Sequence, residues 1–383
     1  MEYSHSRPTA GVAAGYVAGY AGLYSFVVLV GPLMERFNLT EAGIGALFGL
    51  EMLALAIASV WFAGKGTVLN IRRFSLFGLL AITAGYLVAL ASMQLWQFAL
   101  ARFVIGLGEG LVLGAANSAG ATASNSERVF GVAQLAISLA TMLLVSTIPQ
   151  LTVHWDYRAG MCLVLAVVLL AGYFLSFLPE HAVAEKPDKR ISSPTRFPHL
   201  PLGILILLAF LLFSLADLSV WLFSERMGDR IGLSPTTIGL LLGVGTGLGL
   251  AGPVLAILVH VRYGRILPFS AGLLLLAGSI IGLTHASSMQ TYVICLLPLN
   301  FTILFLYPYF LGALAEIDTS GAWTTLSAPV VSFGLVLGPI IAGVLAAQSG
   351  YEAVGWFAGT LTLGALGLML VVLNRPVFRY VQR

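Results

Sequence analysis

The six residues ERFNLT at positions 35–40 return in altered form as DRIGLS at positions 229–234, which is 194 residues later. Each copy leads into a long apolar run that opens with the same Ile-Gly pair, at 44–45 in the first copy and at 238–239 in the second. The identical pairs are Arg36/Arg230, Leu39/Leu233, Ile44/Ile238, Gly45/Gly239, Leu47/Leu241 and Gly49/Gly243. A repeat of this length in an apolar chain indicates a duplicated membrane unit.

The composition indicates an integral membrane protein. Hydrophobic residues make up 58% of the 383 residues and charged residues only 9%, and the mean hydropathy is +0.96. Such a chain cannot cover itself with a water-facing surface, so we expect it to be surrounded by the lipid bilayer. The net charge of +3 is small and its basic residues lie in short loops, so no nucleic-acid partner is expected.

Twelve apolar runs are long enough to cross about 30 Å of hydrocarbon as helices. They cover residues 11–33, 42–63, 74–93, 97–121, 130–151, 160–178, 202–224, 235–259, 267–285, 290–314, 324–347 and 352–373. We therefore predict an all-α membrane protein with twelve transmembrane helices in two pseudo-symmetric six-helix bundles.

The distribution of arginine and lysine predicts that both termini are cytoplasmic, because basic residues concentrate in cytoplasmic loops. With that orientation, 14 of the 19 basic residues are inside: Arg7, Lys65, Arg72, Arg73, Arg128, Lys186, Lys189, Arg190, Arg196, Arg262, Arg265, Arg375, Arg379 and Arg383. Four lie outside, Arg36, Arg158, Arg226 and Arg230, and Arg102 lies within a span.

A charged segment rich in proline separates the sixth and seventh spans and reads as a linker. We predict an N-terminal bundle over residues 1–178, a cytoplasmic linker over 179–200 and a C-terminal bundle over 201–383. Because each half has an even number of spans, the two copies should run parallel, as they do in many secondary transporters.

Four charged residues lie inside predicted spans, where an ion at the membrane centre costs about 2.5 to 3.5 kcal/mol and usually serves function. Glu51 and Glu109 are expected near the midplane, Arg102 nearer the outer face, and Asp217 in the outer third of its span. A carboxyl group in low dielectric favours its neutral form, so Glu51, Glu109 and Asp217 are candidates for proton coupling. For Arg102 we expect a structural or gating role, bonded to Glu51 or to backbone carbonyls, while Asp217 could instead be a simple vestibule residue.

The first span carries two stripes at four-residue spacing. Gly11, Gly15 and Gly19 predict close helix packing. Tyr16, Tyr20 and Tyr24 form a neighbouring stripe, which either lines a cavity or anchors the helix at the interface. Tyr20 is the better candidate for a pocket.

Three elements resemble signatures of the major facilitator superfamily. The loop 64–73 (GKGTVLNIRR) is similar to the GxxxDRxGRR signature, with Val68 and Ile71 in place of its Asp and Gly, and residues 262–265 (RYGR) repeat part of it. Residues 102–108 match RxxxGxG, and the glycines and proline of 334–343 resemble the GxxxGPxxGG element. The resemblance spans nearly the whole chain.

This resemblance implies a cavity surrounded by spans one, four, seven and ten. The cavity candidates are then Tyr20, Glu109, Asp217, Trp221, Asn300 and Tyr307. It also implies a gating role for Arg72, Arg73, Arg262 and Arg265, whose loops lack their own acid and should lean on Glu127, Glu316 or helix C-termini. The alternative is that these arginines anchor the loops to anionic lipid.

No catalytic chemistry is expected. Residues 247–252 satisfy GxGxxG, but they lie in an apolar span with no strand before them, so we interpret them as helix packing. No metal-ligand spacing, nucleophile elbow or Walker lysine occurs. We predict no cofactor, no metal and no enzymatic activity.

The sequence thus favours a secondary active transporter that moves a small organic compound by alternating access, by proton-coupled export or exchange. One alternative is a proton-coupled importer of an organic acid whose carboxylate meets Arg102. An alternative of another class is a non-transporting membrane scaffold or sensor. We expect a monomer in a bacterial inner membrane.

Overall fold

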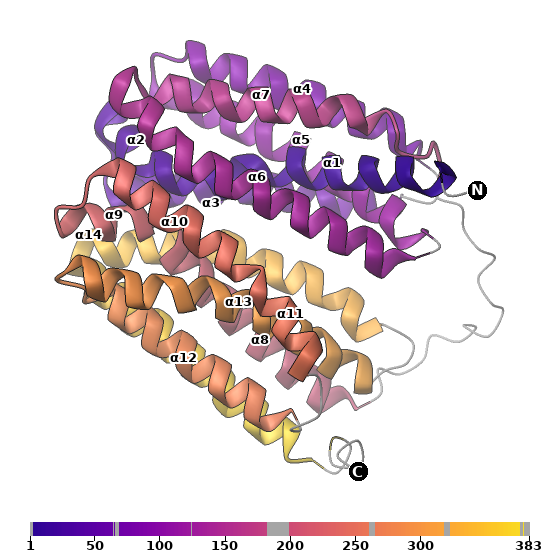
Figure 1. Ribbon diagram of the computed structural model, residues 1–383, viewed down its shortest axis with the longest axis vertical. Helices are drawn as coiled ribbons and strands as arrows, with labels where there is room; N and C mark the ends of the chain where they lie inside the picture. Colours follow the sequence, from indigo (N-terminus) through magenta and orange to yellow (C-terminus); the bar gives the residue numbers. More distant parts are fainter. Residues whose placement is uncertain are drawn as a thin grey trace. The chain divides into compact units, whose positions relative to one another are not determined.

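The computed structural model describes residues 3–63, 65, 69–123, 125–181, 199–259, 265–317, 322–375 and 378. All regular secondary structure in these residues is helical, and Figure 1 shows the order of the helices. By length and composition, eleven helices could cross a membrane. The last of these runs from Leu326 to Leu373 and would measure about 72 Å as one straight helix, more than twice the hydrocarbon thickness.

A break at Gly350 divides that last helix in two. Its φ of 81° and ψ of 173° are not helical, and a positive φ of this kind is accessible mainly to glycine. With this break, the described residues contain the twelve spans that the sequence predicts.

The first six spans follow the predicted ranges closely. The first is built from α1 (Tyr3–Ser25), the 3-10 helix η1 (Phe26–Leu29) and α2 (Val30–Phe37), and the others are α3 (Glu41–Ala63), α4 (Ile71–Ala91), α5 (Leu95–Ala121), α6 (Ser126–His154) and α7 (Tyr157–Leu175). The change of winding inside the first span was not predicted.

The last six spans contain a further irregularity. They are built from α8 (Leu200–Trp221), the short α9 (Ser224–Arg230), α10 (Pro235–Gly249), α11 (Ala251–Val259), α12 (Ile266–Thr284), α13 (Met289–Ile317) and α14 (Ala322–Leu373). The eighth span is divided between α10 and α11 at Leu250.

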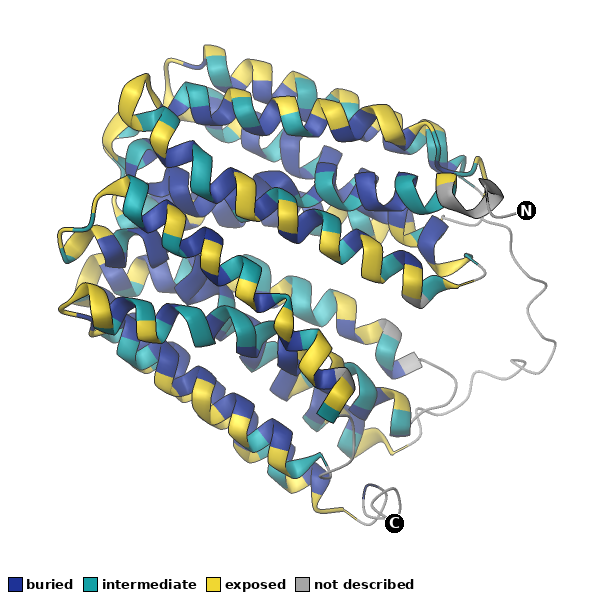
Figure 2. Ribbon diagram, in the orientation of Figure 1, coloured by how far each residue is buried: buried dark blue, intermediate teal, exposed yellow. Residues whose placement is uncertain are grey.

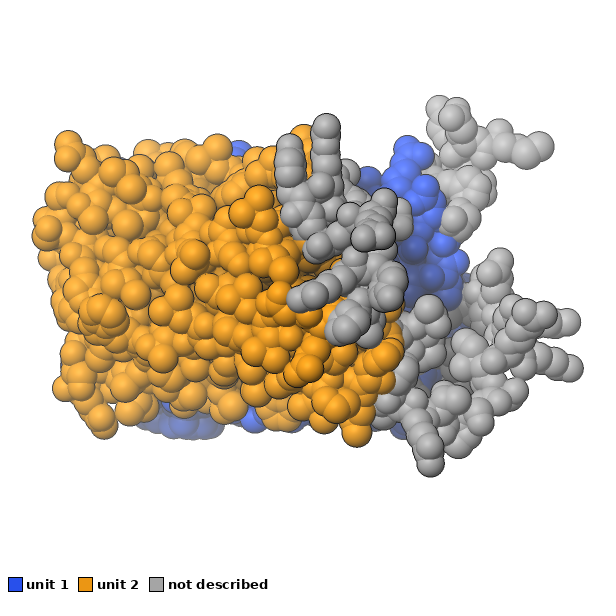
Figure 3. Space-filling view, turned by 90° about the horizontal axis from the view of Figure 1, so that it is seen from below, with its two compact units in different colours: residues 1–39, 46–190 blue, residues 40–45, 191–383 orange. Residues whose placement is uncertain are grey.

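Contacts divide the chain into two units, which Figure 3 distinguishes by colour. Unit 1 comprises Met1–Leu39 and Ala46–Arg190, and unit 2 comprises Thr40–Gly45 and Ile191–Arg383. Residues 182–198 of the predicted linker lie outside the described residues, and the predicted boundaries at 178 and 200 stay a prediction.

The glycine stripe of α1 packs within unit 1 as predicted. A Cβ atom at Gly15 would come within 2.5 Å of the Ala116 Cβ, and one at Gly19 within 2.8 Å of the Leu113 Cδ2. Both neighbours lie on α5, so the missing side chains let α1 and α5 approach closely.

One contact between two helices occurs in both units. The glycine comes from α5 in unit 1 and from the other helix of the pair, α10, in unit 2. In unit 1, Gly106 of α5 lies against the backbone oxygen of Glu51 on α3. In unit 2, a Cβ at Gly245 of α10 would lie 3.0 Å from the Asn300 Nδ2 on α13. Adding 194 to the first pair gives the second, so the repeat seen in the sequence is also a repeat of packing.

The GxGxxG stretch of unit 2 serves helix packing, as predicted. A Cβ at Gly249 would lie 3.2 Å from the Leu304 Cδ1, and one at Gly252 would lie 2.6 Å from the Phe301 backbone oxygen. These glycines therefore bring α10 and α11 against the backbone of α13.

Large apolar side chains lie exposed along the helices, and Figure 2 shows that exposed residues recur along the helical ribbons. Leu80, Leu170 and Leu258 are 64%, 69% and 70% exposed. Apolar exposure on this scale is not stable in water and marks a membrane-facing surface. The chain is a multi-pass integral membrane protein.

Candidate functional site

Unit 1 contains a fully buried group of ionisable side chains, which we call the charge cluster and define as Glu51, Tyr86, Arg102 and Glu109. Glu51 comes from α3, Tyr86 from α4, and Arg102 and Glu109 from α5. Each is at most 1% exposed. Since burial of charge is costly, the partners of each group decide which form it takes.

Arg102 is held by contacts from three elements. Its Nη2 donates to the Glu51 Oε2 in an ion pair, and the ring of Phe26 lies 4.7 Å from the guanidinium carbon. Tyr86 also interacts with the guanidinium. The side chain therefore has both an acceptor and an aromatic face, as a buried cation requires.

Glu109 has no comparable partner. Neither of its carboxyl oxygens accepts or donates a hydrogen bond among the described residues, although both are buried. The charge cluster thus holds two carboxyl groups and one guanidinium, an excess of one negative charge unless one carboxyl group binds a proton. An unpaired buried carboxylate costs several kcal/mol, so a neutral, protonated Glu109 fits this arrangement.

The first span touches Glu109 directly through a glycine. A Cβ at Gly22 would lie 2.5 Å from the Glu109 Oε1 and 2.8 Å from the Tyr86 hydroxyl oxygen. The bare backbone of α1 therefore closes the charge cluster on this side, and any side chain at position 22 would displace one of these two polar groups.

The tyrosine stripe lies on another face of α1. The rings of Tyr16 and Tyr20 are 5.7 Å apart, as are those of Tyr20 and Tyr24. The Tyr16 hydroxyl donates to the Asn117 Oδ1 of α5 over 2.8 Å. All three tyrosines are half-buried, which leaves part of each ring open to a bound molecule.

The candidates of unit 2 lie on α8 and α13. Asp217 is half-buried and has no ion-pair partner among the described residues. Trp221, one turn further along α8, is buried and its Nε1 has no hydrogen-bond acceptor in the described part of the chain. Their spacing of four residues places both on one face of the helix.

The two candidates on α13 have different surroundings. The Asn300 Nδ2 donates to the Leu296 backbone oxygen over 3.3 Å. Tyr307 is 38% exposed and packs edge-on against Phe210, with ring centres 5.0 Å apart. The structure therefore brings Glu51, Arg102 and Glu109 together in unit 1, while the unit 2 candidates carry no comparable cluster.

Two of the loop arginines, Arg72 and Arg265, have partners inside their own units. The Arg72 Nε donates to the Leu178 backbone oxygen over 2.9 Å, and its Nη1 lies 3.2 Å from the Glu180 Oε1. The Arg265 Nη2 lies 2.8 Å from the Glu316 Oε2, a partner that the sequence suggested. Arg262 and the side chain of Glu127 lie outside the described residues, and Arg73 is exposed without an ion pair to the described part of the chain.

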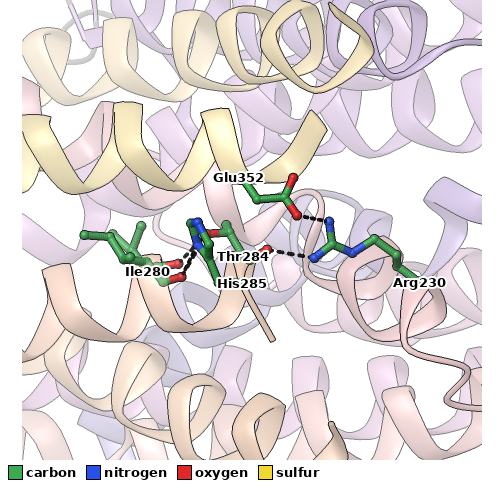
Figure 4. A network of polar contacts seen from close by, with 6 residues as sticks. Arg230, Ile280, Thr284, His285 and Glu352 are labelled. Atoms are coloured by element: carbon green, nitrogen blue, oxygen red, sulfur yellow. Dashed lines mark hydrogen bonds and ion pairs between the residues drawn. The ribbon is translucent and has the colours of Figure 1, made fainter. Parts of the chain in front are cut away.

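The arginine of the repeated phrase ties three helices of unit 2 together. Figure 4 shows Arg230 at the end of α9, with its Nη1 2.6 Å from the Glu352 Oε1 and its Nη2 donating to the Thr284 backbone oxygen over 2.9 Å. Thr284 is the last residue of α12, whose terminal carbonyls lack intrahelical donors. This contact is structural.

Sequence reasoning missed Gly22, Phe26 and Tyr86. Gly22 follows Gly15 and Gly19 at helical spacing, so its place on the packed stripe could have been read. Tyr86 is a polar aromatic side chain inside an apolar span, which is a weaker signal. Phe26 gives none, because nothing in the sequence links an apolar ring to an arginine 76 positions away.

Comparisons with known proteins agree with this architecture. The family model described as Major Facilitator Superfamily matches residues 12–331. A sequence comparison with curated proteins found no match. Similar solved structures include the human organic anion transporter MFSD10 (TETRAN), at 16% identity and a TM-score of 0.71 over 95% of this chain and 99% of that one. A D-xylose–proton symporter is similar at 14% identity and a TM-score of 0.76 over 97% of both chains. At these identities the likeness concerns the fold alone.

Proposed function

The chain belongs to the major facilitator superfamily of secondary transporters, which are not enzymes, and from this premise we propose that it couples the export or exchange of a small organic compound to proton movement. Alternating access of the two six-helix bundles would carry the compound across the membrane. Protons are the coupling ion in this proposal.

The unpaired, fully buried Glu109 is the observation that carries the proposal. A carboxyl group that lacks a cation and donors is held in its neutral form by its surroundings, and it ionises when those surroundings change. A conformational change that gives Glu109 water or a new donor would therefore release its proton. Glu51, which is already paired with Arg102, takes the supporting role.

Neutral or cationic aromatic compounds are the proposed substrates. Asp217 has no ion-pair partner among the described residues, and the three tyrosines of α1 offer aromatic surface. An organic acid would need a free cation, whereas Arg102 is buried and already binds Glu51. This contact makes the organic-acid importer the second choice.

The test is proton flux in proteoliposomes that contain a pH-sensitive dye. Three probes sample the substrate classes: ethidium as an aromatic cation, D-xylose as a neutral sugar and benzoate as an organic anion. We expect a probe-dependent proton flux with wild-type protein, and none with Glu109→Gln, although that variant should still exchange the probe without a gradient. Glu35→Gln is the matched control, because Glu35 is exposed.

Three results would contradict the proposal. Unchanged proton-driven flux in Glu109→Gln would remove this residue from coupling. Absence of flux with every probe, together with specific binding to a membrane or soluble partner, would favour the scaffold or sensor. Benzoate uptake that depends on Arg102 would favour the organic-acid importer.

The proposed setting is a bacterial inner membrane, with a monomeric chain and both termini in the cytoplasm. The support is the excess of arginine and lysine in the loops assigned to the inside. Labelling of single cysteines introduced at Glu180 and at Trp155 in intact cells tests it, because only the second should react with an impermeant reagent.

A further inference from the structure

The first span changes its winding beside the charge cluster. α1 ends at Ser25, and η1 continues as a 3-10 helix from Phe26 to Leu29. The Ser25 hydroxyl donates to the Ala21 backbone oxygen over 2.6 Å and lies 3.3 Å from that of Gly22. Serine bonds of this type compete with the helical ladder and bend helices, and a 3-10 stretch within a helix often marks a hinge.

The same stretch touches both charged residues of α5. Gly22 meets the carboxyl group of Glu109 and the hydroxyl group of Tyr86, as described above. Phe26, one turn later and fully buried, lies against the guanidinium of Arg102. The change of winding therefore falls between a contact with the unpaired acid and a contact with the arginine.

The tyrosine stripe is carried on another side of this helix. At 100° per residue, Tyr16, Tyr20 and Tyr24 lie roughly 130° around the axis from the glycines that pack on α5. A shift in the winding of residues 22–29 would rotate or tilt the tyrosines relative to α5. The half-buried rings would then present a different surface.

We propose that residues 22–29, here called the switch segment, transmit the protonation state of Glu109 to the tyrosine stripe of the first span. The inference rests on the proposed function for the role of the proton. Gly22 acts as a positioning residue, since only its lack of a side chain leaves room for Glu109 and Tyr86 at the same point.

The direction of the switch follows from the charges that face Glu109. These are Glu51 on α3, Tyr86 on α4, Arg102 on α5 and the hydroxyl of Tyr20 on α1. When Glu109 loses its proton, the buried carboxylate needs a donor. Neither Arg102 nor Tyr86 donates to Glu109 here, so either can serve only after a side chain of the charge cluster moves, Arg102 across the Phe26 ring or Tyr86 beside Gly22. Both movements alter the contacts of the switch segment.

Hydrogen exchange of the purified full-length protein in detergent tests this proposal with the proton itself as the probe. Mass spectrometry follows the backbone amides of peptides that cover the switch segment at about pH 6 and about pH 8.5, after correction for intrinsic exchange. We expect protection to differ by about threefold or more between the two conditions, since a local change of winding alters local opening. Glu109→Gln should remove the difference.

Two glycine variants provide a matched pair. Gly22→Ala adds a methyl group that meets Glu109 and Tyr86, whereas Gly131→Ala on α6 adds the same group where nothing lies within 4 Å. We expect Gly22→Ala to lose the pH-dependent difference and Gly131→Ala to keep it. If Gly22→Ala does not fold, Ser25→Ala removes the hydroxyl bond to Ala21 without adding atoms, and it should reduce the difference.

The proposal is overturned if wild-type protein shows no pH-dependent exchange in this segment, if Glu109→Gln keeps it, or if both glycine variants behave alike. These outcomes are separate from the proton-flux test. Loss of flux in Glu109→Gln with pH-independent exchange would leave the proposed function intact and remove the switch segment. A pH-dependent segment without flux for any probe would contradict the proposed function instead.

Discussion

At the scale of single residues, the charge cluster has two carboxyl groups but only one guanidinium, so the charge state of each group depends on the others. Arg102 has one carboxylate partner, Glu51, while Glu109 has none among the described residues. Removal of one member of a buried pair leaves the other as an uncompensated charge, and this costs about 3 to 5 kcal/mol. The stability of unit 1 should therefore respond strongly to substitutions here.

Arg102→Ala should lower the thermal stability of the purified protein, because Glu51 would lose its cation in an apolar interior. Unfolding followed by intrinsic fluorescence in detergent measures the effect. The double variant Glu51→Gln with Arg102→Gln leaves no unpaired charge from this pair and should recover part of the loss. A folded Arg102→Ala protein with unchanged stability and a new preference for anionic probes would contradict the structural role and favour the organic-acid importer.

At the scale of helices, glycine decides how closely two spans approach. Gly252 of α11 leaves no room for a methyl group, since a Cβ there would lie 2.6 Å from the backbone oxygen of Phe301 on α13. Gly278 of α12 has nothing within 4 Å of its Cβ position. The two glycines thus differ in what a side chain at their positions would meet.

Gly252→Ala should destabilise the protein by about 1 to 3 kcal/mol, because the backbone of α13 must move. Gly278→Ala should be neutral or stabilising by about 0.5 to 1 kcal/mol, since alanine favours the helix. Thermal unfolding of both variants in one detergent compares them directly. Equal shifts for the two would show that packing against α13 is not what requires glycine at position 252.

The positions of the helices could be predicted from the sequence, but their rotation could not. A length of about 20 apolar residues marks a span, so all twelve were found. In lipid, however, the face of a helix that meets lipid and the face that packs inside the protein are both apolar. Ile57 of α3 is 52% exposed and Phe62 of the same helix is fully buried, although both side chains are apolar. The pairing of Glu51 with Arg102 could therefore be offered only as one of several possibilities.

The site could be predicted in part for the same reason. Charged residues stand out in an apolar span, so Glu51, Arg102 and Glu109 were found without an alignment. Their uncharged neighbours were missed, because the contacts of Gly22 and Phe26 depend on helix rotation and on a local change of winding. A 3-10 turn leaves no mark in hydropathy.

At the scale of the whole molecule, we propose that the arginines of the loops predicted to be cytoplasmic influence the balance between the two states of the transport cycle. Arg72 is held by the Leu178 carbonyl and by Glu180, both in unit 1, and Arg265 by Glu316 in unit 2. Each loop is therefore fixed to its own unit and would move with that unit during a conformational change.

Replacing both Arg72 and Arg73 by glutamine should shift the equilibrium between the two states toward the inward-open state by about 1 to 3 kcal/mol, a usual size for such coupling. Distances between spin labels on the two cytoplasmic faces would measure the shift. Arg375→Gln serves as the charge control, as this residue lies after the last span. An unchanged distance distribution would reduce these arginines to lipid anchors.

The two copies of the repeat place the glycine of one helix crossing on different helices. The first copy has Glu51 against Gly106, and the second copy has Gly245 against Asn300. The first copy of this crossing has a carboxylate at position 51 and an arginine at position 102, where the second copy has Gly245 and Leu296. The proton coupling that we propose would therefore depend on charged residues in one half of the duplicated chain, while the same crossing in the other half has none.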